Sequence, residues 1–325
     1  MNPLISICIP TYNGQEFIKQ CLNSCIHQSF LNYEIIICDD GSTDKTIEII
    51  EEYASTYPII KFHKNTHNLG LVDNWNKCID MSTGEWIKFV FQDDYITPHC
   101  LQEFSKVINE SAHLIVCKRH FILPENPTND YVNYYTHVVR TLENTGYTNN
   151  THFSPKQIAD ISIRNMCMNF IGEPSLAFFK KNTVTELGYF NNTLKQICDL
   201  EFLLRIASIK GLTYIPQQLC AFRIHYNSTT AKNVEENKYI LSYIEPLLFS
   251  HILLFDSNYT HFRKNLSLFQ QLKLHIYFRV KAYKAYKINS SGNYNHPLFK
   301  NEKEYPEIQK AKTGNIIIKL LSYYF

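Results

Sequence analysis

Two apolar stretches of this chain each run into a pair of aspartates. Residues 35–38 precede Asp39-Asp40-Gly41, and residues 87–91 precede Gln92-Asp93-Asp94. Short apolar runs of this kind are typical of buried strands in a parallel sheet. The carboxyl ends of such strands share one edge, where open α/β sheets bind ligands. Carboxylates gathered there repel one another unless a cation or hydrogen-bond donors offset them, so the pattern favours a nucleotide carried on a divalent metal.

Strand-like and helix-like segments alternate through the first half of the chain. We expect strands at 4–9, 34–38, 59–63, 86–91 and 114–118, and helices at 16–27, 43–56 and 70–81. This alternation with short connections predicts an α/β fold, with a mostly parallel, Rossmann-like sheet covered by helices. Further along, the pattern predicts a long loop at 124–152, a strand at 175–180, a helix at 197–210 and a strand or loop at 213–224.

The last third of the chain has a different, mainly helical pattern. We therefore expect two domains, residues 1–230 and 231–325, in a chain of 325 residues. Five apolar residues recur at helical spacing and indicate one amphipathic helix: Leu268, Leu272, Ile276, Val280 and Tyr283. Basic residues flank this stripe at Lys273, Lys281, Lys284 and Lys287.

Charge is spread unevenly along the chain. Its net charge is +2, yet the segment from Tyr259 to Phe325 holds 12 Lys or Arg and 3 Asp or Glu. A basic, tyrosine-rich region fits an anionic membrane surface, and the open alternative is a solvated helical cap. We expect no nucleic acid among the partners.

The sequence also bears on location. The first residues, Met1-Asn2-Pro3, lack the basic and apolar regions of a signal peptide, and no run of about 18 apolar residues is present. The ten cysteines are scattered without a Cys-x-x-Cys pair, as in proteins with reduced thiols. We therefore expect a cytoplasmic protein, able to lie peripherally on the inner face of the cell membrane.

A third acidic position stands at the start of the helix expected at 197–210. Asp199 there either complements the helix dipole or serves as a general base at the mouth of a pocket. The two aspartate pairs likewise leave a choice between solvated turns and a ligand site.

The order of these motifs resembles the family 2 glycosyltransferases of the GT-A fold, over residues 4 to about 230. The residues that carry the resemblance are Pro10-Thr11-Tyr12-Asn13-Gly14, Asp39 to Asp44, Asn68-Leu69-Gly70, Gly84 to Ile87, Gln92-Asp93-Asp94, and Asp199 with Arg205. The resemblance implies transfer of a sugar from a nucleotide diphosphate sugar, a UDP-sugar being favoured, to an acceptor hydroxyl with inversion. It also implies a Mn²⁺ or Mg²⁺ cofactor and a place in bacterial surface polysaccharide or oligosaccharide synthesis.

The resemblance assigns roles residue by residue. It implies a catalytic base at Asp199 and a metal at Asp94, with His225 as a further ligand. Glu173 and Arg223 match an acceptor loop and a loop that closes over the diphosphate. The implied nucleotide-binding residues are Pro10, Thr11, Tyr12, Asp40, Asn68, Gly70 and Asp93.

Two departures from the family pattern matter. Many members have Asp-x-Asp-Asp where this chain has Phe91-Gln92-Asp93-Asp94, and many have Glu before the base where this chain has Cys198.

The acceptor implied by the resemblance is a glycan or a lipid-linked oligosaccharide that receives a single sugar. The competing hypotheses are a nucleotidyltransferase, whose glycine- and lysine-rich phosphate loop is missing between Pro10 and Gly14, and a catalytically silent sugar-nucleotide-binding module.

Overall fold

The computed structural model describes residues 4–125, 127, 142, 148–166, 168–225, 228, 240–293, 296–299, 305–311 and 316–322. The chain divides into two compact units. The first consists of Met1–Ser154 and Asn169–His225, and the second of Pro155–Met168 and Tyr226–Phe325. The expected boundary at residue 230 and most of the expected loop at 124–152 lie outside the described residues.

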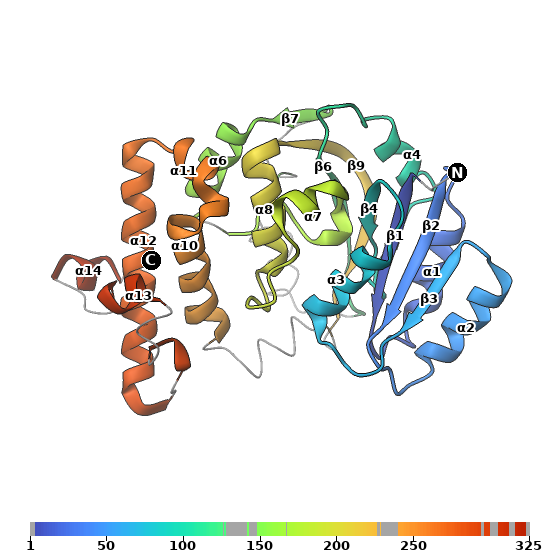
Figure 1. Cartoon of the computed structure of the whole chain (residues 1–325), viewed down its shortest axis with the longest axis horizontal. Coiled ribbons are helices and arrows are strands. Elements are labelled where there is room, and N and C mark those ends of the chain that lie inside the picture. The colour runs from blue at the N-terminus through green and yellow to red at the C-terminus, as the bar shows by residue number, and fades with distance from the viewer. Residues whose placement is uncertain are drawn as a thin grey trace. The chain divides into compact units, whose positions relative to one another are not determined.

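Within the described part of the first unit, the strands form one nine-stranded sheet (Figure 1). The strands are β1 (Ile5–Thr11), β2 (Tyr33–Asp39), β3 (Ile60–Lys64), β4 (Trp86–Phe89), β5 (Tyr95–Ile96), β6 (Leu114–Ile122), β7 (Thr151–Phe153), β8 (Ala177–Lys180) and β9 (Leu212–Arg223). Their order is β3-β2-β1-β4-β8-β6-β9-β5, and β7 pairs with β9.

The sheet has a parallel half and a mixed half. Strands β1 to β4 pair in parallel, as predicted, and β6 also runs parallel to β9. Strand β8 is antiparallel to both β4 and β6, and β5 and β7 are antiparallel to β9. The fold is therefore a mixed α/β sheet surrounded by helices.

Helices cover both faces of this sheet (Figure 1). They are α1 (Ile18–Ile26), α2 (Thr46–Thr56), α3 (Leu71–Met81), α4 (Cys100–Ser105), α7 (Asn182–Leu187) and α8 (Cys198–Lys210), with a 3-10 turn, η3 (Pro174–Leu176), ahead of β8. Every residue of β1 and β2 is buried, which explains why both strands are mostly apolar. The predicted strands and helices between residues 4 and 91 are confirmed, with ends that move by at most three residues.

The middle position of β1 decides where the site forms. Because β1 lies between β2 and β4, its carboxyl end, at Thr11 and Tyr12, lies between the two acidic segments. The backbone confirms this placement, since the amide of Asp40 donates to the carbonyl oxygen of Thr11 at 2.8 Å. The sheet thus gathers residues about 30 and 80 positions apart at one edge.

An ion pair between buried Glu34 and half-exposed Lys61 fastens the opposite end of β2. Glu34 accepts hydrogen bonds from the Ser6 hydroxyl at 2.6 Å, from the Thr83 amide at 2.6 Å and from the Lys61 ammonium at 2.5 Å. Burial alone would raise the pKa of Glu34, but the Lys61 charge and these hydrogen bonds outweigh it and lower the pKa to about 2.

The described part of the second unit is helical. It contains α6 (Pro155–Arg164), η4 (Ile240–Ile244), α10 (Glu245–Phe255), η5 (Ser257–Tyr259), α11 (Thr260–Lys264), α12 (Leu268–Ile288), η6 (Asn289–Asn293), η7 (Pro297–Phe299), α13 (Pro306–Ala311) and α14 (Ile316–Leu321). The long helix α12 packs against α10, α13 and α14, and α6 joins it from a distant part of the sequence.

The helix predicted from the apolar stripe is confirmed as α12. It packs through Leu274, Phe278, Val280, Ala282 and Ala285, whereas Leu268 and Leu272 of the stripe are exposed. Apolar and aromatic residues occur on nearly every side of this helix, so that spacing alone does not select the packed face.

Among the described helices, none alone combines the length and apolar character needed to cross a bilayer. The segments Ile240–Phe255 and Ser257–Lys264 reach that composition only together, as a pair bent by 68°.

Candidate active site

The first acidic segment closes a turn through Asp39. Its buried carboxylate accepts hydrogen bonds from the amides of Gly41 and Ser42, at 3.1 and 2.8 Å, and from the Thr11 hydroxyl at 2.9 Å. Gly41 has φ of +83°, a conformation that a residue with a Cβ resists. Asp39 therefore shapes the turn, and its neighbour Asp40 faces the next loop.

Asp40 organises the loop that the sequence analysis placed beside a nucleotide. Its carboxylate oxygens accept from the amides of Leu69 and Gly70, at 2.7 and 2.9 Å, and from the side chain of Asn65 at 3.0 Å. The side-chain amide of Asn68 donates to the Asp40 carbonyl oxygen at 2.9 Å. The predicted group of Asp40, Asn68 and Gly70 is thus brought together, with Asp40 buried and Asn68 exposed.

The turn after β1 contacts the second acidic segment. Pro10 and Thr11 are buried, whereas Tyr12 is exposed. The Tyr12 amide donates to Gln92 Oε1 at 2.9 Å, and Gln92 Nε2 donates to the Tyr12 carbonyl oxygen at 3.0 Å. Gln92, at the variable position of the Asp-x-Asp-Asp pattern, therefore ties the second acidic segment to the turn of β1.

The two carboxylates of the second segment lie in different surroundings. Asp94 is 2% exposed and accepts from the Ser175 hydroxyl at 2.6 Å and from the Arg223 amide at 3.0 Å. Burial, and then the charge of Asp93, raise the pKa of Asp94 well above its ordinary value. Asp93 is more accessible, and its Oδ2 lies 3.0 Å from Nε2 of His225. The accessible carboxylate of the pair is therefore Asp93.

The segment after β9 packs over this pair. Arg223 donates from Nε to the Asp93 carbonyl oxygen at 3.0 Å, and its guanidinium lies over the Phe17 ring at 4.7 Å. The ring of His225 lies 5.0 Å from the same phenyl ring. Among the described residues, the buried Nδ1 of His225 has no hydrogen-bond partner. Asp93, Asp94, Arg223 and His225 thus form one cluster, which brings together residues about 130 positions apart.

A second cluster surrounds the loop that precedes η3. Glu173 accepts two hydrogen bonds from Nη1 of Arg119, at 2.6 and 2.8 Å. The amide of Gly172 donates to Asn169 Oδ1 at 2.9 Å, and Asn169 Nδ2 donates to Asp199 Oδ2 at 3.2 Å. Asn169 therefore brings the Glu173 loop and Asp199 together.

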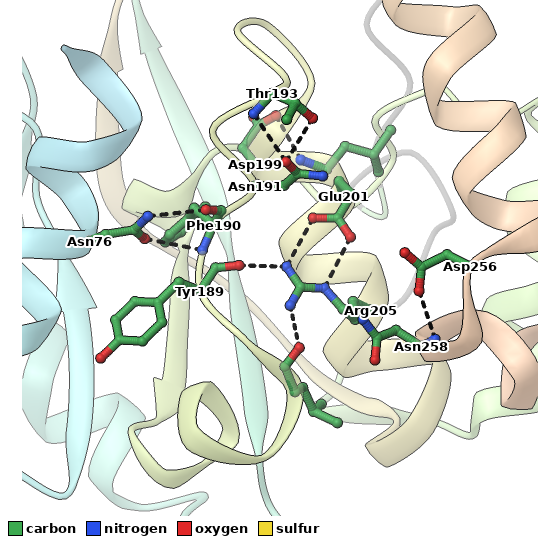
Figure 2. A network of polar contacts seen from close by, with 12 residues as sticks. Asn76, Tyr189, Phe190, Asn191, Thr193, Asp199, Glu201, Arg205, Asp256 and Asn258 are labelled. Carbon is green, nitrogen blue, oxygen red and sulfur yellow. Dashed lines mark hydrogen bonds and ion pairs between the residues drawn. The ribbon is translucent and has the colours of Figure 1, made fainter. Parts of the chain in front are cut away.

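Asp199 lies in the first turn of α8, where the helix dipole favours a carboxylate. Its Oδ1 accepts from the Leu200 amide at 2.6 Å. Glu201, two residues after Asp199, is buried against Arg205, whose Nε and Nη2 donate to it at 3.0 and 2.9 Å (Figure 2). Glu201 is thus held by Arg205 and is not the accessible carboxylate of this turn.

The approach to α8 is fixed by polar contacts to backbone atoms (Figure 2). Arg205 donates to the carbonyl oxygens of Leu187 and Tyr189, the latter at 2.7 Å. Asn76 donates to the Phe190 carbonyl oxygen at 3.0 Å and accepts from its amide at 3.1 Å. These contacts hold the chain that leads to Asp199 against α3 and α8.

Several residues of the site were missed by the sequence analysis. Asn169, Arg119 and Phe17 each contact a predicted site residue, yet none stands in a recognisable motif. Ser175 lies two residues after Glu173 of the predicted acceptor loop, but no role was predicted for it. No role was predicted for Gln92 either; the sequence signal beside it was Gly14, where a Cβ would lie 2.2 Å from Gln92 Oε1.

Among the described residues, no group of three or more His, Cys, Asp or Glu side chains is arranged to hold a metal ion. At the acidic edge, Asp93 and His225 form a pair of possible ligands, with Oδ2 and Nε2 3.0 Å apart.

The chain was compared with known proteins. It is 27% identical over 254 residues to an uncharacterised protein of Mycobacterium tuberculosis, across 75% of this chain and 77% of that protein. It is 36% identical over 108 residues to chondroitin synthase of Escherichia coli, but this match covers only 32% of this chain and 16% of the synthase. The chain therefore spans a small part of that relative.

Solved structures show the same fold at low identity. TarS 1–349 of S. aureus in complex with UDP-GlcNAc has a TM-score of 0.59 and 18% identity, over 94% of this chain and 79% of that one. The mannosyltransferase PcManGT of Pyrobaculum calidifontis, in complex with GDP-Man and Mn²⁺, has a TM-score of 0.55 and 17% identity, over 100% of this chain and 88% of that one. The fold is thus similar to that of GT-A glycosyltransferases.

The family model described as glycosyl transferase family 2 matches residues 6–170, which hold both acidic segments and the turn after β1. With the fold and the edge cluster described above, this match shows that the chain belongs to glycosyl transferase family 2.

Proposed function

We propose that the protein transfers a sugar from a nucleotide diphosphate sugar to an acceptor hydroxyl with inversion at the anomeric carbon. One observation carries the proposal furthest. Ser175 donates to Asp94 of the acidic edge, and it lies two residues after Glu173 in the loop that Asn169 joins to Asp199. The loop thus connects an edge suited to a donor nucleotide with a carboxylate suited to deprotonate an acceptor.

The nucleotide would bind at the edge between β1, β2 and β4. The exposed ring of Tyr12 and the exposed side chain of Asn68 flank this edge, while buried Asp40 keeps the Asn68 loop in place. Two solved relatives of the same fold bind UDP-GlcNAc and GDP-Man, which supports a sugar nucleotide as ligand. We favour a UDP-sugar as the donor.

Two residues of the edge fit a hard divalent cation such as Mn²⁺ or Mg²⁺. Asp93 and His225 offer one carboxylate and one imidazole, and such cations are often bound by one or two protein ligands plus substrate phosphates. Asp94 fits less well than the sequence indicated, because its oxygens accept hydrogen bonds from Ser175 and Arg223 inside the protein. We therefore assign the metal to Asp93 and His225, with Asp94 holding the segment in place. When bound, the ion would neutralise charge on the leaving diphosphate.

Asp199 would act as the general base. Its Oδ2, oriented by Asn169, takes the proton of the acceptor hydroxyl as the acceptor oxygen bonds to the anomeric carbon. The bond to the diphosphate oxygen breaks in the same displacement, so the configuration inverts. Glu173, held by the buried Arg119, borders this place and would contact acceptor hydroxyl groups.

The acceptor we propose is a glycan or a lipid-linked oligosaccharide in bacterial surface polysaccharide synthesis, extended by one sugar at a time. The E. coli chondroitin synthase among the relatives is a polysaccharide synthase by name, which supports this setting. The protein would work in the cytoplasm, at the inner face of the membrane.

A screen of sugar nucleotides tests the proposal. Thermal stabilisation by one UDP-sugar in the presence of Mn²⁺ should identify the donor, and NMR of the product should give an anomeric configuration opposite to that of the donor. A product with retained configuration would contradict the inverting mechanism.

Release of pyrophosphate instead of nucleoside diphosphate would indicate a nucleotidyltransferase. Tight binding without hydrolysis or transfer, across a panel of acceptors, would indicate a silent binding module.

A further inference from the structure

The first two turns of α12 expose three large apolar side chains. Leu268 is 86% exposed, Phe269 76% and Leu272 56%. Scattered exposed apolar residues are normal, but three within five positions form a contiguous patch, which in a folded protein marks an interaction surface. These three residues are called the apolar patch below.

The exposure of the apolar patch follows from how α12 is anchored. Ser267 and Gln270 form a capping box at the start of the helix, so the patch lies on ordered helix. Gln270 Nε2 also donates to Asp160 of α6 at 2.7 Å, and Lys273 Nζ donates to the Ile163 carbonyl oxygen at 3.2 Å. Helix α6 covers the side of α12 that carries Gln270 and Lys273, and Leu274 is buried on the packed side. The apolar patch is left facing outward.

The surroundings of the apolar patch are cationic. From Thr260 to Ile288, across α11 and α12, the chain carries seven Lys or Arg and neither Asp nor Glu. Leu268, Leu272, His275 and Arg279 are all exposed and follow one another at helical spacing along a single stripe. Lys264, just before the helix, is exposed as well. The stripe thus passes from apolar to basic within three turns.

We propose that this surface docks on an anionic lipid membrane, with the apolar patch entering the headgroup region and Lys264 and Arg279 contacting lipid phosphates. Apolar burial and attraction to anionic lipids are the two contributions that hold interfacial helices on membranes. A second copy of the chain fits this surface less well, because a two-fold contact would bring the same cationic stripe against itself. The inference goes beyond sugar transfer, and it does not depend on it.

Vesicle co-sedimentation of the full chain tests the proposal. Wild-type protein should bind vesicles of phosphatidylcholine with phosphatidylglycerol more tightly than vesicles of phosphatidylcholine alone. The triple variant Leu268→Ser, Phe269→Ser, Leu272→Ser should bind the mixed vesicles at least about tenfold more weakly. Leu31→Ser is the matched control, since Leu31 is 87% exposed in the first unit and should not affect binding.

A fluorescence arm reports insertion directly. The two native tryptophans, Trp75 and Trp86, are buried, so Phe269→Trp adds the exposed fluorophore. Its emission should shift to shorter wavelength on mixed vesicles and stay unchanged on phosphatidylcholine alone. Adding Lys264→Glu and Arg279→Glu to the Phe269→Trp protein should abolish the shift.

Three outcomes would overturn the proposal. The first is equal vesicle binding by the wild type and the triple variant, with both folded by circular dichroism. The second is equal binding to the two vesicle types. The third is a lipid-free wild-type dimer in sedimentation equilibrium that the triple variant loses, which would assign the apolar patch to self-association. Turnover of a soluble sugar nucleotide should be the same in all these variants, so the lipid result stands apart from that of the proposed reaction.

Discussion

Gln92 and Tyr12 exchange two hydrogen bonds: the backbone amide of Tyr12 donates to Gln92 Oε1 at 2.9 Å, and Gln92 Nε2 donates to the carbonyl oxygen of Tyr12 at 3.0 Å. The amide side chain thereby pairs with the turn after β1 much as a neighbouring strand would. A carboxylate at position 92 could accept from the amide but could not donate to the carbonyl. Gln92, at the variable position of the Asp-x-Asp-Asp pattern, therefore provides a contact that orders the proposed nucleotide site.

We expect Gln92→Ala to weaken UDP binding by about tenfold, because two hydrogen bonds that order Tyr12 are lost. Gly14→Ala should do the same by a different route, since its Cβ would lie 2.2 Å from Gln92 Oε1 and displace that side chain. Isothermal titration calorimetry with UDP measures both. Gln102→Ala, at an exposed site away from the edge, is the control, and unchanged affinity in the first two variants would contradict the role of this pair.

Asp93→Asn and Asp94→Asn should have different consequences. Asp93→Asn removes the accessible carboxylate and should abolish the gain in UDP affinity that Mn²⁺ confers, with little change in Tm. Asp94→Asn should mainly lower Tm, because its buried oxygens hold Ser175 and Arg223. Calorimetry with and without Mn²⁺, beside thermal melts, separates the two. A lost Mn²⁺ effect in Asp94→Asn alone would restore Asp94 as the metal ligand.

Asp199→Asn should lower kcat by about 10²–10⁴-fold while leaving UDP affinity nearly unchanged, because only basicity is removed. Glu201→Gln is the matched control on the same helical turn. It breaks a buried pair with Arg205 and should lower the free energy of unfolding by about 3 kcal/mol while the folded fraction keeps its turnover. More than about a tenth of the wild-type rate in Asp199→Asn would place the base elsewhere.

Acid should weaken the fold through Glu34. Its folded-state pKa of about 2 lies below the value near 4.5 of a free glutamate, so its ionisation stabilises the protein above about pH 5. This contribution, on the order of 2–3 kcal/mol, is lost as the pH falls from about 5 to about 2. Urea unfolding of wild type and Glu34→Gln should therefore differ at pH 7 and converge in acid. Glu85→Gln, at an exposed ion pair with Lys180, should differ from wild type by less than about 1 kcal/mol at either pH.

Local pattern was enough to predict the parallel half of the sheet. Strands β1, β2 and β4 are buried throughout and mostly apolar, so each reads as a buried strand, and the aspartates that follow β2 and β4 had to meet at one edge. The grouping of Asp40 with Asn68 and Gly70 followed from the same strand order.

Other features depended on contacts that local pattern does not encode. The direction of β8 is set by its pairing with β4 and β6, far away in the sequence. The burial of Asp94 depends on Ser175, 81 positions away, and nothing in the Asp93-Asp94 pair itself shows which carboxylate turns inward. The packed face of α12 likewise depends on its contacts with α6 and α10.

The hydrogen bond from Ser175 to Asp94 has a thermodynamic consequence. It places the acidic edge and the loop of Glu173 in one bonded network, to which Lys88 adds a further hydrogen bond to the Ser175 carbonyl oxygen. If donor binding changes the hydrogen bonds of Asp94, it changes the free energy of the Glu173 loop. By thermodynamic linkage, acceptor binding at that loop then changes donor affinity by the same amount. Donor and acceptor affinities should therefore be cooperative, and Ser175→Ala, which removes the shared hydroxyl, should make the two binding events independent.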